Sequence, residues 1–159
     1  MGDRLIPGTL ITISLRKGKT LLNPLPNTLP VDFVSGCAML VRRDVFEKVG
    51  VLDHSLIMYG EEIDLCWRAS QAGYLIACAP KARVWHKVSL SADKDKPNSR
   101  YLKHRNQILF YRKYSKGLQY PLMFFFSLLK LIQLSIIDIY HHTTSLIPVT
   151  ARAWLDGWR

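Results

Sequence analysis

The spacing of hydrophobic and polar residues differs between the two parts of the chain. Up to about residue 90, short apolar runs separated by glycine and proline predict strands and two short helices. Beyond residue 97, apolar residues recur at helical spacing. The expected strands cover residues 10–15, 31–34, 74–79 and 83–88, and the expected helices cover 44–49, 61–72, 98–116, 121–141 and 150–159. The pattern therefore predicts an α/β region, residues 1–97, followed by a helical region, residues 98–159.

Three carboxylates lie in the first turn of the helix expected over residues 61–72, namely Glu61, Glu62 and Asp64. Acidic residues stabilise a helix N-terminus through the macrodipole, and Asp64 can pair with Arg68 four residues later. This structural explanation accounts for Asp64. Two adjacent glutamates repel each other unless they share a proton or a cation, so we expect a functional role for at least one of them.

Other candidate residues flank this cluster. Ser35, Gly36 and Cys37 follow an apolar run, and the glycine allows close approach of a ligand, although packing explains it equally well. His86 lies in the strand expected over 83–88, and a lone histidine is more often structural than a ligand. Asp93-Lys94-Asp95 has the letters of a metal motif, but its lysines favour a solvated run of charges.

The net charge of +10 is concentrated in one segment. Residues 1–80 hold eight basic and eight acidic residues, whereas residues 81–116 hold eleven basic and two acidic ones. The helix expected over 98–116 is therefore basic and amphipathic. Such a helix suits an anionic membrane surface, a phosphate-bearing ligand or a nucleic acid.

The apolar segment 121–141 is nearly long enough to span a bilayer. Lys130 and Asp138 would be costly in its centre, and at helical spacing they share one side with Ser127 and His141. We expect this helix to lie in the membrane interface or against a hydrophobic partner; a core helix is the alternative. Cys37, Cys66 and Cys78 lack metal-type spacing and predict reduced, buried thiols of a cytosolic protein.

Three segments in register resemble one known family. They are SGCAMLVRRDVFEKVGVLD, YGEEIDLCWRASQAGY and APKARVWH, and the downstream RYLKHRNQILFYRKY agrees with them. Together they resemble the C-terminal half of family 2 glycosyltransferases with a GT-A, Rossmann-like fold, especially the rhamnosyltransferase-like branch. The resemblance is strong over residues 31–116 and weak over the tail.

The resemblance implies transfer of a sugar, with rhamnose as one candidate, from a nucleotide-diphosphate sugar to a polysaccharide or lipid-linked acceptor, with inversion. By position, Glu62 matches the general base, usually an aspartate, and Glu61 and Asp64 match its flanking acids. His86 matches a histidine that helps bind a divalent metal, Mg or Mn, in some members. The segment 35–37 matches the residues that line the acceptor and donor cleft.

The chain departs from the family pattern in one respect. Members begin with a nucleotide-binding βαβ half that carries a strand-end Asp-x-Asp, and no such half precedes residue 31. We therefore expect a fragment that is inactive alone, or a second polypeptide that supplies the donor half, and an exposed sheet edge that favours association.

The resemblance and the charge pattern together predict a protein at the inner, cytoplasmic face of the cell membrane, acting in cell wall polysaccharide biosynthesis. The alternative is a non-catalytic peripheral membrane or interaction module. A nucleic-acid-binding protein is less favoured, because no recognised reader motif is present and the basic helix is followed by an apolar one.

Overall fold

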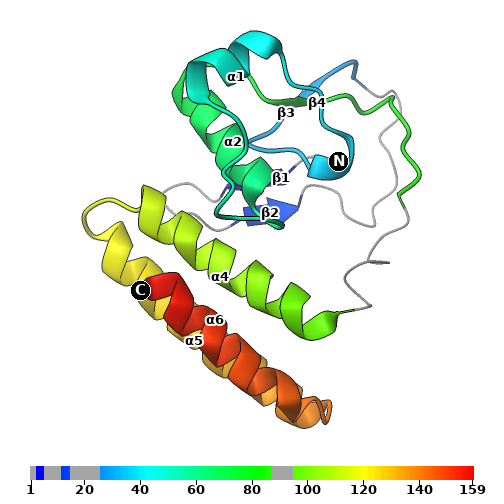
Figure 1. Ribbon diagram of the computed structural model, residues 1–159. Helices are drawn as coiled ribbons and strands as arrows, with labels where there is room; N and C mark the ends of the chain where they lie inside the picture. The colour runs from blue at the N-terminus through cyan, green and yellow to red at the C-terminus, as the bar shows by residue number, and fades with distance from the viewer. Residues whose placement is uncertain (1–2, 6–11, 15–25, 87–94) are drawn as a thin grey trace. The chain divides into compact units, whose positions relative to one another are not determined.

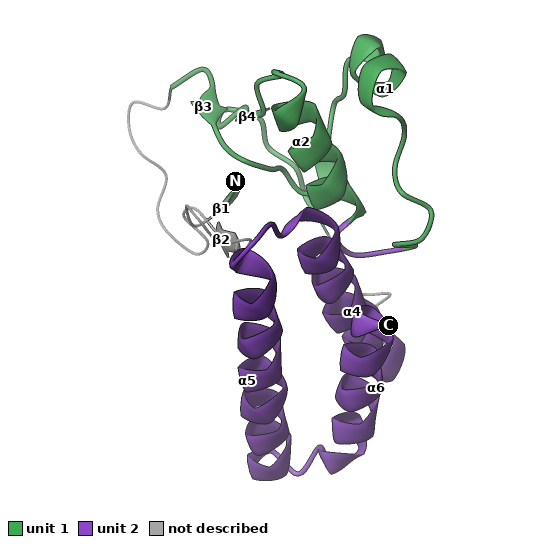
Figure 2. Cartoon of the chain, turned by 90° about the vertical axis from the view of Figure 1, so that its left-hand side faces the viewer, with its two compact units in different colours: residues 1–7, 11–57, 61–86 green, residues 8–10, 58–60, 87–159 purple. Residues whose placement is uncertain are grey.

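The computed structural model describes residues 3–5, 12–14, 26–86 and 95–159. These residues form two compact units (Figure 2). Among the described residues, unit 1 holds 3–5, 12–14, 26–57 and 61–86, and unit 2 holds 58–60 and 95–159. The fold is mixed α/β, with mostly helices and small two-stranded sheets.

The strands of unit 1 are short and antiparallel. β1 (Asp3–Leu5) pairs with β2 (Thr12–Ser14), and β3 (Leu29–Pro30) pairs with β4 (Ala77–Cys78). One further backbone hydrogen bond, from Val31 N–H to Ile76 C=O at 3.0 Å, continues the second pair. The residues that follow this pairing, Val31 and Phe33, are buried in the core of unit 1.

The sequence predicted longer strands than the structure contains. Over the expected strand 74–79 only Ala77–Cys78 forms one, and residues 83–86 of the last expected strand lie outside any strand. These four residues are exposed, Trp85 among them, so no burial supports an extended ladder there.

Both helices expected in unit 1 are present, as α1 (Arg43–Val49) and α2 (Glu61–Gln71). Gly50 follows α1 with φ +81°, a left-handed conformation that costs glycine little, and its N–H donates to the Phe46 carbonyl at 2.9 Å. α2 buries Leu65, Cys66 and Ala69 in the core of the unit. Gly50 therefore ends α1, and both helices lie close to the ranges that the sequence predicted.

Unit 2 is a set of helices that lie side by side (Figures 1 and 2): α4 (Lys96–Tyr114), α5 (Gln119–Tyr140) and α6 (Ile147–Trp158), with a short 3-10 helix η2 (Thr144–Leu146) before α6. α6 packs most closely on α4, where Gly157 lies against Ile108. The expected helices over 98–116, 121–141 and 150–159 are all present.

α4 starts at Lys96, two residues before the predicted start at residue 98. The N-cap is Asp95, whose Oδ1 accepts a hydrogen bond from the Asn98 backbone N–H at 3.1 Å. Lys96 and Pro97 then occupy the first turn, where proline needs no hydrogen-bond partner. Asp95, part of the predicted charge run, is thus a helix cap, and residues 93 and 94 lie outside the described residues.

Candidate functional site

The three carboxylates begin α2, as the sequence predicted, but they point in different directions. Successive residues of a helix are rotated by about 100°, so residues four apart share a face. Glu62 therefore shares a face with Cys66, and Asp64 shares another with Arg68. The two faces have separate surroundings in unit 1.

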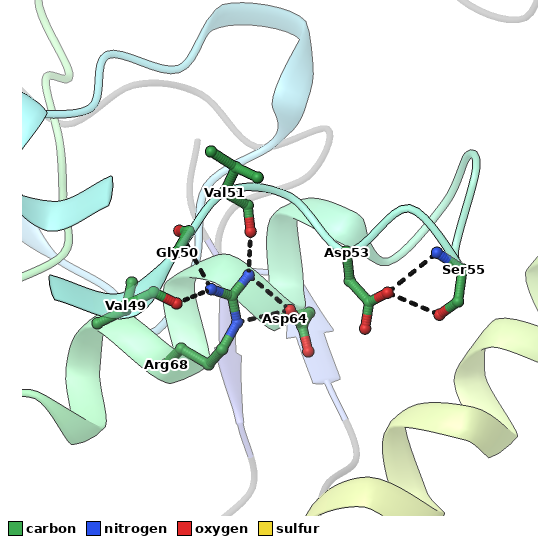
Figure 3. A network of polar contacts seen from close by, with 7 residues as sticks. All are labelled: Val49, Gly50, Val51, Asp53, Ser55, Asp64 and Arg68. Atoms are coloured by element: carbon green, nitrogen blue, oxygen red, sulfur yellow. Dashed lines mark hydrogen bonds and ion pairs between the residues drawn. The ribbon is translucent and has the colours of Figure 1, made fainter. Parts of the chain in front are cut away.

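Asp64 is buried and pairs with Arg68 (Figure 3). The Arg68 Nε donates to Asp64 Oδ2 at 2.8 Å, which confirms the predicted pair. The same guanidinium donates to the carbonyls of Val49, Gly50 at 3.2 Å and Val51 at 2.8 Å. Asp64 thus orients an arginine that ties α2 to the end of α1.

Glu62 lies beside the segment that the sequence singled out as a cleft lining. A Cβ added to Gly36 would stand 3.8 Å from the Glu62 Cβ. Gly36 opens the 3-10 helix η1 (Gly36–Ala38), and Ser35, Gly36 and Cys37 are exposed. The structure therefore brings Gly36 and Glu62 together on an exposed part of unit 1.

Cys66, one turn after Glu62, faces the same segment. Burial raises the pKa of the Cys66 thiol, the Val34 backbone hydrogen bond lowers it, and the charge of Glu62 raises it again. Cys66 is therefore a neutral, buried thiol, as predicted. Cys37 was also predicted to be buried, but it is exposed because η1 lies on the surface.

Glu61 differs from both other acids. Its Oε2 is buried and has no hydrogen-bond partner among the described residues. A buried oxygen of this kind is costly to leave unsatisfied, and it suits a proton or a cation. Glu61 thus has a buried acceptor oxygen without a partner among the described residues.

The turn before Glu61 has an unusual backbone. Ile57 and Tyr59 have φ of +58° and +70°, and Gly60 has +100°. Within unit 2 the buried Asn106 holds this turn, since its Nδ2 donates to the carbonyls of Met58 and Tyr59, each at 2.8 Å. Sequence reasoning missed Asn106, because its neighbours Arg105 and Gln107 are polar too and nothing in the local sequence distinguishes it.

His86 and the predicted metal site remain a prediction. His86 is exposed. The described residues contain no group of three or more histidine, cysteine or acidic side chains placed to hold a metal ion. Within unit 1, the buried Glu61 oxygen without a partner among the described residues is a feature that fits a cation, and a single oxygen does not make a metal site.

Comparisons with known proteins find similarity to part of several sugar transferases. The chain is 35% identical over 85 residues to an N-acetylglucosaminyl-diphospho-decaprenol L-rhamnosyltransferase of Mycobacterium tuberculosis, a match covering 54% of this chain and 28% of that protein. It is 33% identical over 84 residues to the low-salt glycan biosynthesis hexosyltransferase Agl10 of Haloferax volcanii, covering 52% and 27%. It is 41% identical over 56 residues to the rhamnosyltransferase WbbL of Escherichia coli, covering 35% and 21%.

These similarities support a glycosyltransferase family for the chain. These relatives are rhamnosyltransferases and a hexosyltransferase, so transfer of a sugar is what their names have in common. The match spans little more than a quarter of the length of the relatives from M. tuberculosis and H. volcanii. No family model matches the chain, and no solved structure matches it.

Proposed function

We propose that this chain is the acceptor-binding and catalytic part of an inverting glycosyltransferase of family 2 with a GT-A fold. The enzyme moves a sugar, with rhamnose as the first candidate, from a nucleotide-diphosphate sugar to a polysaccharide or lipid-linked acceptor. The observation that supports this most directly is the position of Gly36 beside Glu62. A glycine there leaves room for a substrate hydroxyl next to a carboxylate.

In this proposal Glu62 is the general base. Its carboxylate takes the proton of the acceptor hydroxyl while that oxygen attacks the anomeric carbon and the nucleoside diphosphate leaves. Glu62 is exposed enough to meet a substrate, whereas Asp64 is buried and paired with Arg68. Asp64 therefore contributes through Arg68, by fixing α2 against the end of α1.

The complete enzyme is proposed to use a divalent metal, Mg or Mn, which would stabilise the leaving diphosphate. Glu61, through its unpartnered oxygen, and His86 are the candidate ligands in this chain. Further ligands and the nucleotide-sugar site belong to a donor-binding half, either upstream in the same protein or on an associated polypeptide. We place the enzyme at the inner face of the cell membrane, in cell wall polysaccharide synthesis.

The test is a transfer assay with the donor-binding half present. The chain is expressed with the coding sequence directly upstream of Met1, and transfer from dTDP-rhamnose to a polyprenyl-diphosphate-linked sugar is measured. We expect Glu62→Gln to reduce kcat by about 100-fold or more, because the amide cannot accept the proton. A Glu62→Gln enzyme with full activity would remove Glu62 as the base.

Glu47→Gln is the matched control. Glu47 is an exposed glutamate of α1 that pairs with Arg43 on the surface of the same unit. The same substitution there should leave kcat unchanged. If the unchanged enzyme is active and both variants lose activity equally, the loss comes from removing a negative charge and not from removing the base.

The second candidate is a non-catalytic membrane module, and the exposed apolar face of α5 favours it. In that case the complete protein would bind vesicles and transfer no sugar. The assay above separates the two candidates.

A further inference from the structure

Helix α5 turns both of its charged side chains and the Ser127 hydroxyl inward. Lys130 donates to Gln107 Oε1 of α4 at 2.6 Å, and Asp138 pairs with Arg100 of α4 at 2.9 Å. The Ser127 hydroxyl accepts hydrogen bonds from the indoles of Trp154 and Trp158 on α6, at 2.9 and 3.0 Å. The side chains that are costly in an apolar medium therefore have partners inside unit 2.

The opposite side of α5 is apolar and exposed along the whole helix. One exposed polar residue, Gln133, lies on this side. The other exposed residues are large and hydrophobic: Leu122, Phe125, Phe126, Leu129, Ile132, Ile136, Ile137, Ile139 and Tyr140. We call this set the outer face of α5. α5 is the described helix long and apolar enough to cross a membrane, and 17% of its apolar window is buried. Among the described residues, α5 is therefore packed on one side only.

Charge favours a lipid surface as the occupant of this face. The exposed charged side chains described in unit 2 are mainly basic, and they include Lys96, Lys103, Lys113, Lys116 and Arg152. The outer face itself carries no charge. An apolar face on a positively charged helical unit suits the interface of an anionic bilayer, where apolar insertion and attraction to lipid headgroups act together.

The packing of α5 argues against a spanning orientation. α4 lies along α5, since Arg100 reaches Asp138 and Gln107 reaches Lys130. If α5 crossed the bilayer, the exposed Lys103 of α4, which lies between those two contacts in the chain, would be carried to the depth of the hydrocarbon. A charged side chain there is costly.

We propose that unit 2 docks on the surface of an anionic bilayer, with α5 lying in the membrane plane and its outer face inserted. α4 and α6 then remain on the aqueous side, and Lys130 and Asp138 stay in their contacts with α4. This gives the proposed membrane location a surface and an orientation. The test of this docking proposal measures no sugar transfer. The docking proposal can therefore fail while the proposed function holds, and the proposed function can fail while the docking proposal holds.

The experiment is a flotation assay of the full chain with vesicles of phosphatidylcholine and with vesicles that also contain phosphatidylglycerol. We expect stronger binding to the anionic vesicles and weaker binding as salt is added. The double variant Leu129→Gln/Ile136→Gln should lower the partition coefficient about tenfold, because two inserted apolar side chains are lost. Both residues are 61% exposed, so the substitution leaves the packing of unit 2 intact.

The matched control is Leu75→Gln/Leu155→Gln, which changes two exposed apolar residues outside α5, at 79% and 50% exposure. It should bind as the unchanged chain does. Far-UV circular dichroism in solution checks that all variants fold. Equal binding by the two double variants would overturn the proposal. So would a failure of the unchanged chain to bind anionic vesicles, or sedimentation that shows a dimer held by the outer face.

Orientation is tested by oriented circular dichroism on stacked anionic bilayers. Because α4, α5 and α6 lie side by side, all three contribute to the same signal (Figure 2). We expect the strong 208 nm band of helices in the membrane plane. Loss of that band would show a perpendicular α5 and would overturn the in-plane orientation.

Discussion

At the scale of single residues, three carboxylates of one helical turn have three different environments. Asp64 is buried in an ion pair, Glu61 has a buried oxygen without a partner in the described residues, and Glu62 lies beside Gly36. Because successive residues of a helix are rotated about its axis, the three side chains point in different directions. Their order in the sequence predicted the Asp64 pair, because that pair is local, but not the surroundings of the two glutamates, which depend on residues far away in the chain.

The buried pair leads to a prediction about stability. Asp64→Ala leaves Arg68 without its carboxylate and should lower the free energy of unfolding by about 3 kcal/mol. Glu47→Ala is the control, because the Arg43–Glu47 pair has the same i,i+4 spacing at 92% and 61% side-chain exposure. That change should cost less than about 0.5 kcal/mol. Urea unfolding measures both, and equal losses would contradict the role of the Asp64 pair.

His104 of α4 gives a prediction about pH. Its pKa is lowered from 6.5 to about 4, chiefly by burial and then by the nearby charges of Lys130, Arg100 and Lys103, while Asp138 acts in the opposite direction. The folded state therefore holds a neutral imidazole that the unfolded chain would protonate below its ordinary pKa. Stability should be unaffected above that ordinary value and should fall as the pH drops from 6.5 toward 4.

The measurement is urea unfolding at a series of pH values, with His104→Gln as the comparison. The variant cannot take up the proton, so its stability should depend less on pH across this window. A histidine titration by NMR checks the pKa directly. Identical pH profiles for the two proteins would rule out His104 as the source.

At the scale of elements, the helices were predictable and the strands were not. A helix forms its hydrogen bonds within its own residues, so periodicity and stop signals such as Gly50 locate it. A strand needs a partner, and the partner of Leu29–Pro30 is Ala77–Cys78, far along the chain. The expected strand over residues 83–88 had the right composition but, at residues 83–86, no pairing in the structure.

The contact between α4 and α6 depends on one small residue. A Cβ at Gly157 would stand 2.7 Å from the Ile108 Cβ, closer than real side chains approach. Gly157→Ala should therefore destabilise unit 2 by about 1–2 kcal/mol, although alanine favours helices. Gly36→Ala, whose added Cβ meets ordinary contact distance, should change the stability by less than about 0.5 kcal/mol. Thermal unfolding compares them, and a stabilised Gly157→Ala would contradict the close packing.

At the scale of the whole molecule, the sequence predicted two regions of different character. The basic and apolar helices of unit 2 follow from charge and periodicity, and the mixed α/β character of unit 1 follows from its short apolar runs. The sequence could not predict that residues 58–60 belong with unit 2, because this depends on Asn106, 47 residues after Tyr59. Long-range polar contacts of this kind leave no periodic signal.

The contact made by Asn106 also has a consequence for biosynthesis. A chain leaves the ribosome from its N-terminus, so Met58 and Tyr59 emerge well before the asparagine that will bind their carbonyls. The turn that leads into Glu61 can acquire these hydrogen bonds only after most of α4 has been made. The turn at residues 58–60 is therefore completed late, by a helix translated after it, and a nascent chain arrested before Asn106 would lack that finished turn.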